Sequence, residues 1–163
     1  MNVFGSESSQ DRLDEVIAQA IHEDYVESQT RKGETTETNP ALVGWEALPE
    51  HIKESNRSQA VHIAEKLKTI GCGIAESECR VGRRFEFEPD EIEQLAWMEH
   101  DRWVKERLAD SWTVGPKSVD KKTHPLLLMS YDELPEEEKE KDREAVRRIP
   151  KLLAKVGLEV RRS

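Results

Sequence analysis

The feature that most constrains this sequence is an internal repeat. The stretch TNPALVGWEALP at 38–49 and the stretch THPLLLMSYDELP at 123–135 read almost alike. A shift of 86 positions lays residues 44–72 over residues 130–158 without a gap. This shift superposes, among others, Trp45 on Tyr131, Asn56 on Asp142, Arg57 on Arg143, and Gly71 on Gly157.

Two further matches lie upstream of that block. IAQAIHEDYV at 17–26 lies over LAWMEHDRWV at 95–104 at a shift of 78, which pairs His22 with His100. A shift of 85 places residues 38–40 over residues 123–125. Because the blocks follow the same order in both halves, we infer an internal duplication.

Each half predicts the same plan: a helix, a polar loop, an extended segment before proline, a Leu-Pro-Glu turn and a second helix. Apolar residues recur at helical spacing in these segments, and Gly71 and Gly157 end the second helices. Pro150 predicts that the last helix starts or kinks near Ile149. We therefore expect a mainly α fold of two pseudo-twofold-related helical-hairpin halves, about 13–78 and 90–163, in which each half covers the apolar stripe of the other.

Short β-strands complete the predicted fold. Phe85 and Phe87 alternate with charged residues in 79–89, a pattern typical of a short strand, and the C-terminal GLEVRRS is its predicted partner. Residues 1–12 are expected to be flexible. The whole chain, 1–163, is predicted to be a single domain, because its length allows one core.

Composition excludes several classes of function. The net charge of -9 argues against general nucleic-acid binding, which usually requires an excess of Lys and Arg. No apolar run approaches membrane-spanning length, so we expect no membrane insertion. Cys72 and Cys79 lack metal-binding spacing and suit a reducing cytoplasm. Because no standard catalytic or cofactor motif occurs, the sequence predicts no catalytic residues, no metal and no cofactor.

One helical stripe of the second half carries ligand-binding chemistry. Ala96, His100, Trp103 and Arg107 follow one another at steps of four, three and four. In one interpretation His100 and Arg107 face an anionic or planar ligand on which Trp103 stacks. In the other, the stripe is packing surface between the halves and each histidine bonds a backbone carbonyl. The first half keeps the histidine but has Gln29 in place of the arginine.

A second candidate group lies in the first half. Asn56, Arg57 and His62 are predicted near a helix N-terminus, which attracts anions and where arginine offers two parallel donors. The alternative is that Asn56 caps the helix while Arg57 pairs with a nearby acid, as Asp142 and Arg143 do in the copy.

The loop 111–125 is longer than its counterpart in the first half and is locally basic. Lys122 and His124 lie in it with two further lysines. This patch is expected to bind phosphate, to dock a protein partner or to expose Ser118 and Thr123 for modification. An ordinary solvated loop is the alternative.

Residues 95–158 resemble the ryanodine receptor (RyR) repeat domain. The resemblance rests on a His-x-x-Trp helix, a Ser-Trp-x-x-Gly turn, a Lys-Lys-x-His-Pro segment and a Leu-Pro-x-x-Glu helix start: His100 and Trp103, Trp112 and Gly115, 121–125, and 134–143. It extends more weakly over 13–74, where NRSQAVHIAEKLKTIG is similar to bacterial stand-alone members. The resemblance implies a mainly helical module with internal two-fold pseudosymmetry, and a sensing role for a nucleotide-like ligand.

These patterns lead to one functional hypothesis and one alternative. The hypothesis is a cytoplasmic, non-enzymatic regulatory module that binds an anionic, nucleotide-like small molecule between its halves. Its predicted ligand residues are Asn56, Arg57, His62, His100, Trp103, Arg107, Lys122 and His124. The alternative is a protein-interaction or scaffold module, related to the peripheral cytosolic repeats of calcium-release channels.

Overall fold

The computed structural model describes residues 3–77 and 85–163 and is mainly helical, with one small antiparallel sheet in the part described. This confirms the predicted fold class. The chain forms two compact units, one of Met1–Phe85 with Pro150–Ser163 and one of Glu86–Ile149. The last segment of the second half-repeat therefore packs within the first unit, which the sequence did not indicate.

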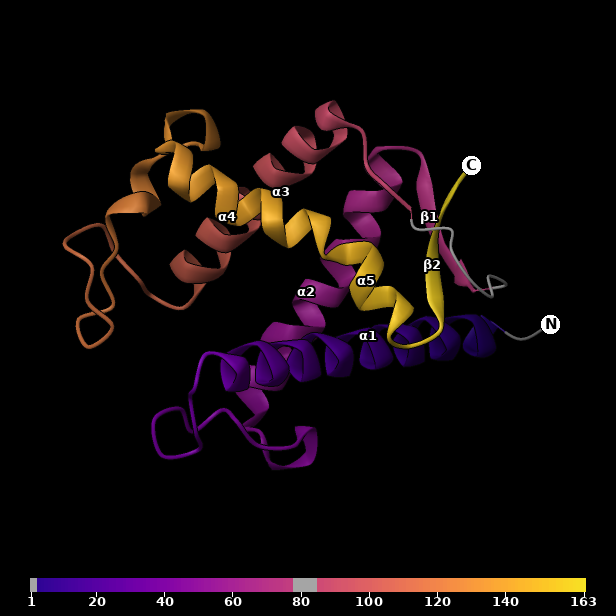
Figure 1. Cartoon of the computed structure of the whole chain (residues 1–163), viewed down its shortest axis with the longest axis horizontal. Coiled ribbons are helices and arrows are strands. Elements are labelled where there is room, and N and C mark those ends of the chain that lie inside the picture. Colours follow the sequence, from indigo (N-terminus) through magenta and orange to yellow (C-terminus); the bar gives the residue numbers. More distant parts are fainter. Residues whose placement is uncertain (1–2, 78–84) are drawn as a thin grey trace. The chain divides into compact units, whose positions relative to one another are not determined.

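The first unit is built around a pair of helices. Helix α1 spans Val3–Arg31 and helix α2 spans Glu50–Thr69, and the two pack against each other (Figure 1). A 3-10 turn, η1 at Trp45–Ala47, lies between them in sequence. The helices bury apolar side chains at helical spacing, including Ile17, Ala18, Ala60, Ile63 and Leu67.

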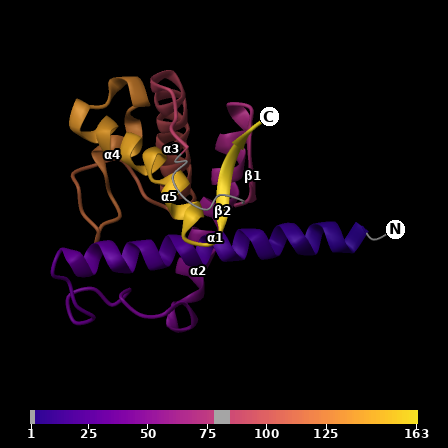
Figure 2. The same cartoon turned by 45° about the vertical axis from the view of Figure 1, so that its right-hand side comes forward.

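A two-stranded sheet completes the first unit. Strand β1, Cys72–Glu76, pairs antiparallel with strand β2, Leu158–Arg162, and the two views of Figures 1 and 2 show them side by side. The central pair joins Ile74 to Val160, which are equivalent residues of the two halves. Since the flanking bonds Ser163 N–Gly71 O at 3.0 Å and Ser77 N–Gly157 O at 2.9 Å are also equivalent, the ladder is symmetric about its centre.

The predicted partner of the C-terminal strand was wrong. Residues 78–84 of the expected strand lie outside the described residues, and residues 85–88 adopt no strand. The pairing is set instead by Gly71 and Gly157, which have φ of 74° and 73° and redirect the chain at the ends of α2 and α5. Because both halves leave their last helix in the same way, the two following segments meet as partners.

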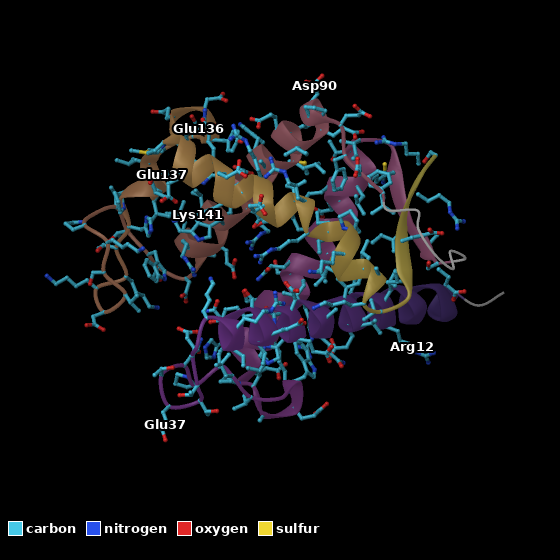
Figure 3. All side chains as sticks on the ribbon, in the orientation of Figure 1. Arg12, Glu37, Asp90, Glu136, Glu137 and Lys141 are labelled. Atoms are coloured by element: carbon cyan, nitrogen blue, oxygen red, sulfur yellow. The ribbon has the colours of Figure 1, made fainter. Side chains whose placement is uncertain are left out.

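The second unit repeats the helical pair. Helix α3 spans Pro89–Ala109 and helix α4 spans Glu136–Arg147, with 3-10 turns η2 at Pro125–Leu128 and η3 at Tyr131–Glu133 before α4. Figure 3 shows Asp90 in the first turn of α3 and Glu136 and Glu137 in the first turn of α4. These carboxylates suit the positive end of a helix dipole. Leu95, Ala96 and Val146 are fully buried where α3 and α4 pack.

Proline divides the last helical segment as predicted. Helix α4 ends at Arg147, and the short helix α5 spans Ile149–Ala154, with Pro150 in its first turn. Proline suits this position because the first turn of a helix needs no intrahelical N–H donor.

Candidate functional site

The repeated histidines make the same hydrogen bond in each half. His22 Nε2 lies 2.6 Å from the carbonyl oxygen of Val43, and His100 Nε2 lies 2.7 Å from that of Met129. Both rings are buried. These contacts agree with one part of the packing interpretation, the bond from each histidine to a backbone carbonyl. Each bond joins the helix to the extended segment of its own half.

The repeated arginines also have matching partners. Arg57 bonds Glu15 of α1 at 2.7 Å and Glu50 of its own helix at 2.8 Å, and it also bonds Glu54. In the copy, the partners of Arg143 are the equivalent residues: Glu93 of α3, Glu136 and Glu140. The hydrogen bond to Glu15 is the main cause that raises the pKa of Arg57. The charge of Arg57 is thus balanced within its own half, as the ion-pair alternative for this residue predicted.

The helix start predicted at Asn56 was wrong. Helix α2 begins at Glu50, so Asn56 lies well inside the helix, where it is buried and cannot act as the N-cap. Pro49 takes the N-cap position instead. His62 lies further along the same helix and is half-buried. The local sequence did contain the correct start, since Leu48-Pro49 directly precedes Glu50, the acidic residue of the first turn.

An arginine and three rings come together in the second unit. The guanidinium of Arg107 lies over Trp103, 5.6 Å from the ring centroid, and over Trp112, at 5.0 Å. His124 meets Trp103 edge-on with centroids 4.9 Å apart. All four side chains are half-buried. We call Trp103, Arg107, Trp112 and His124 the arginine–indole cluster.

The structure brings some of the predicted site residues together and leaves others apart. Trp103, Arg107 and His124 meet in the cluster, and His100 stacks on Trp103 with centroids 5.9 Å apart. Lys122 bonds Asp110 instead, with its Nζ 3.2 Å from the backbone carbonyl oxygen of Asp110. Sequence reasoning used Trp112 only as part of a family motif and missed it as a site residue. Its position five residues after Arg107 was the available signal.

Arg107 and Arg102 lie on the same helix but differ in the groups that contact their guanidinium. Arg102 bonds Glu99 at 2.6 Å and Glu106 at 2.5 Å. For Arg107, no ion pair with a carboxylate is found among residues 3–77 and 85–163; its contacts are the two indole rings. Arg107 is thus a half-buried cation whose described contacts are aromatic, in a chain of net charge -9.

His124 contributes a neutral donor to the cluster. Its Nδ1 accepts a hydrogen bond from the backbone N–H of Leu126 at 3.1 Å, so the proton of the neutral ring lies on Nε2. Burial lowers the pKa of His124 most, and the positive charges of Lys117, Arg107 and Lys141 lower it further, against Glu138, which raises it. Lys141 is labelled on α4 in Figure 3.

In the described part of the chain, no group of three histidine, cysteine or acidic side chains is placed to hold a metal ion. None of its helices combines the length and apolar character that crossing a bilayer would need.

Comparison with known proteins gives a family match in the second half. The family model described as RyR domain matches residues 88–162, which include α3, the arginine–indole cluster, α4 and β2. No match was found among curated protein sequences. The first half repeats the histidine and arginine contacts of the matched region. The match over residues 88–162 confirms the resemblance to the RyR domain that the motifs in the sequence indicated.

Proposed function

We propose that this chain is a non-enzymatic, cytoplasmic regulatory module whose RyR domain binds an anionic small molecule, such as a nucleotide, at the arginine–indole cluster. The observation that carries the proposal is Arg107, whose cation lies over two indoles and has no carboxylate partner in the described residues. A guanidinium held by aromatic rings presents several donors to an oxyanion, and exposed indole surface suits a planar ligand body.

The other predicted ligand residues have weaker support. Arg57 already meets three carboxylates, and Lys122 lies 3.5 Å from the carboxylate of Asp110. The Nε2 atom of His100 is already hydrogen-bonded to the carbonyl oxygen of Met129. We therefore place Trp103, Arg107 and His124 at the centre of the proposal, joined by Trp112.

A thermal-shift screen with mono-, di- and cyclic nucleotides tests the proposal, because a ligand that binds only the folded state raises the melting temperature. We expect at least one nucleotide to raise the melting temperature of the wild type but not of Arg107→Gln. Lys68→Gln removes one exposed positive charge from helix α2 and serves as the control, with the wild-type shift retained. Absence of a shift with every nucleotide, or an equal shift in Arg107→Gln, contradicts the proposal, and turnover of any nucleotide contradicts a non-enzymatic role.

A protein-interaction module is the second candidate, and exposed apolar side chains support it. Val119 is 77% exposed and Leu128 is 74% exposed, both in the region after α3. If a protein partner binds there, Val119→Asp with Leu128→Asp abolishes its binding, while Arg107→Gln retains it. The reverse pattern in a pull-down experiment contradicts this candidate.

A further inference from the structure

The first half holds a carboxylate of its own at the place that corresponds to the arginine–indole cluster. Glu34 Oε2 accepts hydrogen bonds from Gln29 Nε2 at 2.6 Å and from Asn39 Nδ2 at 3.0 Å. The same Asn39 group bonds the hydroxyl of Tyr25 at 2.8 Å. The hydrogen bonds from Asn39 and Gln29 lower the pKa of Glu34, so this group of side chains stabilises a negative charge.

The backbone establishes which residues correspond at the end of the first helix of each half. The N–H of Glu34 bonds the carbonyl of Gln29 at 3.1 Å, and the N–H of Trp112 bonds that of Arg107 at 2.9 Å. The preceding residue has positive φ in both cases, 89° in Gly33 and 67° in Ser111. Arg107 thus takes the place of Gln29, and Trp112 takes the place of Glu34.

The second donor corresponds in the same way. Asn39 Oδ1 accepts from the N–H of Ala41 at 3.0 Å, and His124 Nδ1 accepts from the N–H of Leu126 at 3.1 Å. Each side chain accepts a hydrogen bond from the backbone N–H two residues later and has one donor group remaining. For Asn39 that group is Nδ2, which bonds Glu34; for His124 it is Nε2–H.

The second half therefore keeps the two donors and lacks the carboxylate. It also exchanges the amide of Gln29 for the guanidinium of Arg107, and charged donors bind oxyanions more strongly than neutral ones. The residue at the position equivalent to Glu34 is Trp112, and the guanidinium of Arg107 lies over its indole ring. In the first half, the donors of Gln29 and Asn39 bond a carboxylate of the same chain, Glu34. In the second half, we infer that the donors of Arg107 and His124 bond a carboxylate from another molecule.

We propose that the arginine–indole cluster binds the carboxylate of an aromatic acid, at the position that the Glu34 carboxylate holds in the first half. This inference rests on the proposed function, in which an anion binds at this cluster. A guanidinium carries its donors in its own plane, and a planar carboxylate accepts two parallel hydrogen bonds from it. The group that takes the corresponding place in the first half, Glu34, is a carboxylate, and this favours a carboxylate over other oxyanions. Trp103 and Trp112 supply ring surface for an aromatic body.

Titration with benzoate, followed by tryptophan fluorescence and by calorimetry, tests the inference. Inorganic phosphate and benzyl alcohol serve as comparison probes that lack the planar carboxylate. We expect benzoate to bind the wild type more tightly than either probe, and Arg107→Gln to weaken benzoate binding about tenfold or more, since a hydrogen bond to a charged group is lost. Lys68→Gln, at an exposed position on α2, is the charge-matched control and should bind benzoate as the wild type does.

A second pair of variants tests the correspondence with Glu34 directly. Trp112→Glu gives the second half the acid of the first, whereas Trp112→Gln removes the indole without adding charge. We expect Trp112→Glu to bind benzoate about tenfold more weakly than Trp112→Gln, since its own carboxylate occupies Arg107. Trp112→Glu should also melt at a higher temperature than Trp112→Gln, a result that needs no ligand.

The outcomes separate this inference from the proposed function. If phosphate or a nucleotide binds in an Arg107-dependent way and benzoate does not, the carboxylate inference is wrong and the proposed function stands. If none of these anions binds, both are wrong. If Trp112→Glu and Trp112→Gln bind benzoate equally and melt at the same temperature, the correspondence with Glu34 is wrong.

Discussion

Arg57 joins helix α2 to helix α1 through Glu15, whose Oε2 lies 2.7 Å from the guanidinium Nε. The pair connects residues 42 positions apart in sequence, and a second bond from the same guanidinium reaches Glu15 Oε1 at 3.2 Å. Arg143 and Glu93 make the equivalent link between α4 and α3. Each helical pair is therefore held by one arginine that also contacts the first turn of its own helix.

Removing the arginine that links two helices should cost more stability than removing one that pairs only within its helix. Arg143 reaches Glu93 on α3, whereas the partners of Arg147 are Glu140 and Glu144 on α4 itself. The Arg143 side chain is 15% exposed and that of Arg147 is 41% exposed. We expect Arg143→Ala to lower the melting temperature by about 4 °C or more, and Arg147→Ala by about 1 °C or less, as followed by circular dichroism. Equal effects would show that the link between helices adds nothing.

The carboxylates of these links should make stability depend on acid pH. The hydrogen bond from Arg57 is the main cause that lowers the pKa of Glu15 below 4.5, and that from Arg143 does the same for Glu93. A group whose pKa is lower in the folded state stabilises the fold fully above its unfolded pKa and loses this effect as the pH falls through its folded pKa. The melting temperature should therefore decrease below about pH 4.5.

The double variant Glu15→Gln with Glu93→Gln provides the control for that pH dependence. It should melt lower than the wild type near pH 7, since both ionic links lose their charge. Its melting temperature should change less between about pH 5 and about pH 3, because the two groups with lowered pKa are gone. An identical acid profile in both proteins would show that other carboxyl groups cause the loss of stability.

His100 should contribute to stability through the carbonyl of Met129. His100→Ala leaves that acceptor without its imidazole partner and opens space beside Trp103, which together should lower the free energy of unfolding by about 2–3 kcal/mol. His51→Ala, at an exposed position on α2, should change it by less than about 0.5 kcal/mol. Urea unfolding monitored by tryptophan fluorescence measures both values, and similar midpoints for the two variants would contradict the role of His100.

The equivalence of Ser111 and Gly33 predicts a stabilising substitution. Ser111 has φ of 67°, a conformation in which a side chain is strained and glycine is not, and Gly33 shows φ of 89° at the matching position. Ser111→Gly should raise the free energy of unfolding by about 0.5 kcal/mol. Ser58→Gly, inside helix α2, should lower it by a similar amount, because glycine is a poor helix former. Thermal melts that show the same sign for both substitutions would contradict this reasoning.

The candidate site could be predicted only in part, for a reason visible in Arg57 and Arg107. The sequence marks both as candidate ligand residues, although Glu54, three residues before Arg57, is a partner that helical spacing does indicate. Arg57 meets Glu15, which lies far away in the chain, whereas the nearest contacts of Arg107 are aromatic. The pair of Arg57 with Glu15 depends on which helices pack together, and helical spacing alone does not contain that information.

The sequence by itself determined the duplication, the helical character of each half, the glycine at the end of each second helix and the RyR resemblance. These features depend on residues close together in the chain: apolar spacing, proline and glycine backbone preferences, and local motifs. Only the tertiary structure decided that β2 pairs with β1, that Arg57 is balanced by carboxylates, and that Arg107 lies over two indoles where the first half has the Glu34 carboxylate bonded to Gln29. Each of those depends on groups brought together from distant segments, whose distances are set by packing and not by neighbouring residues.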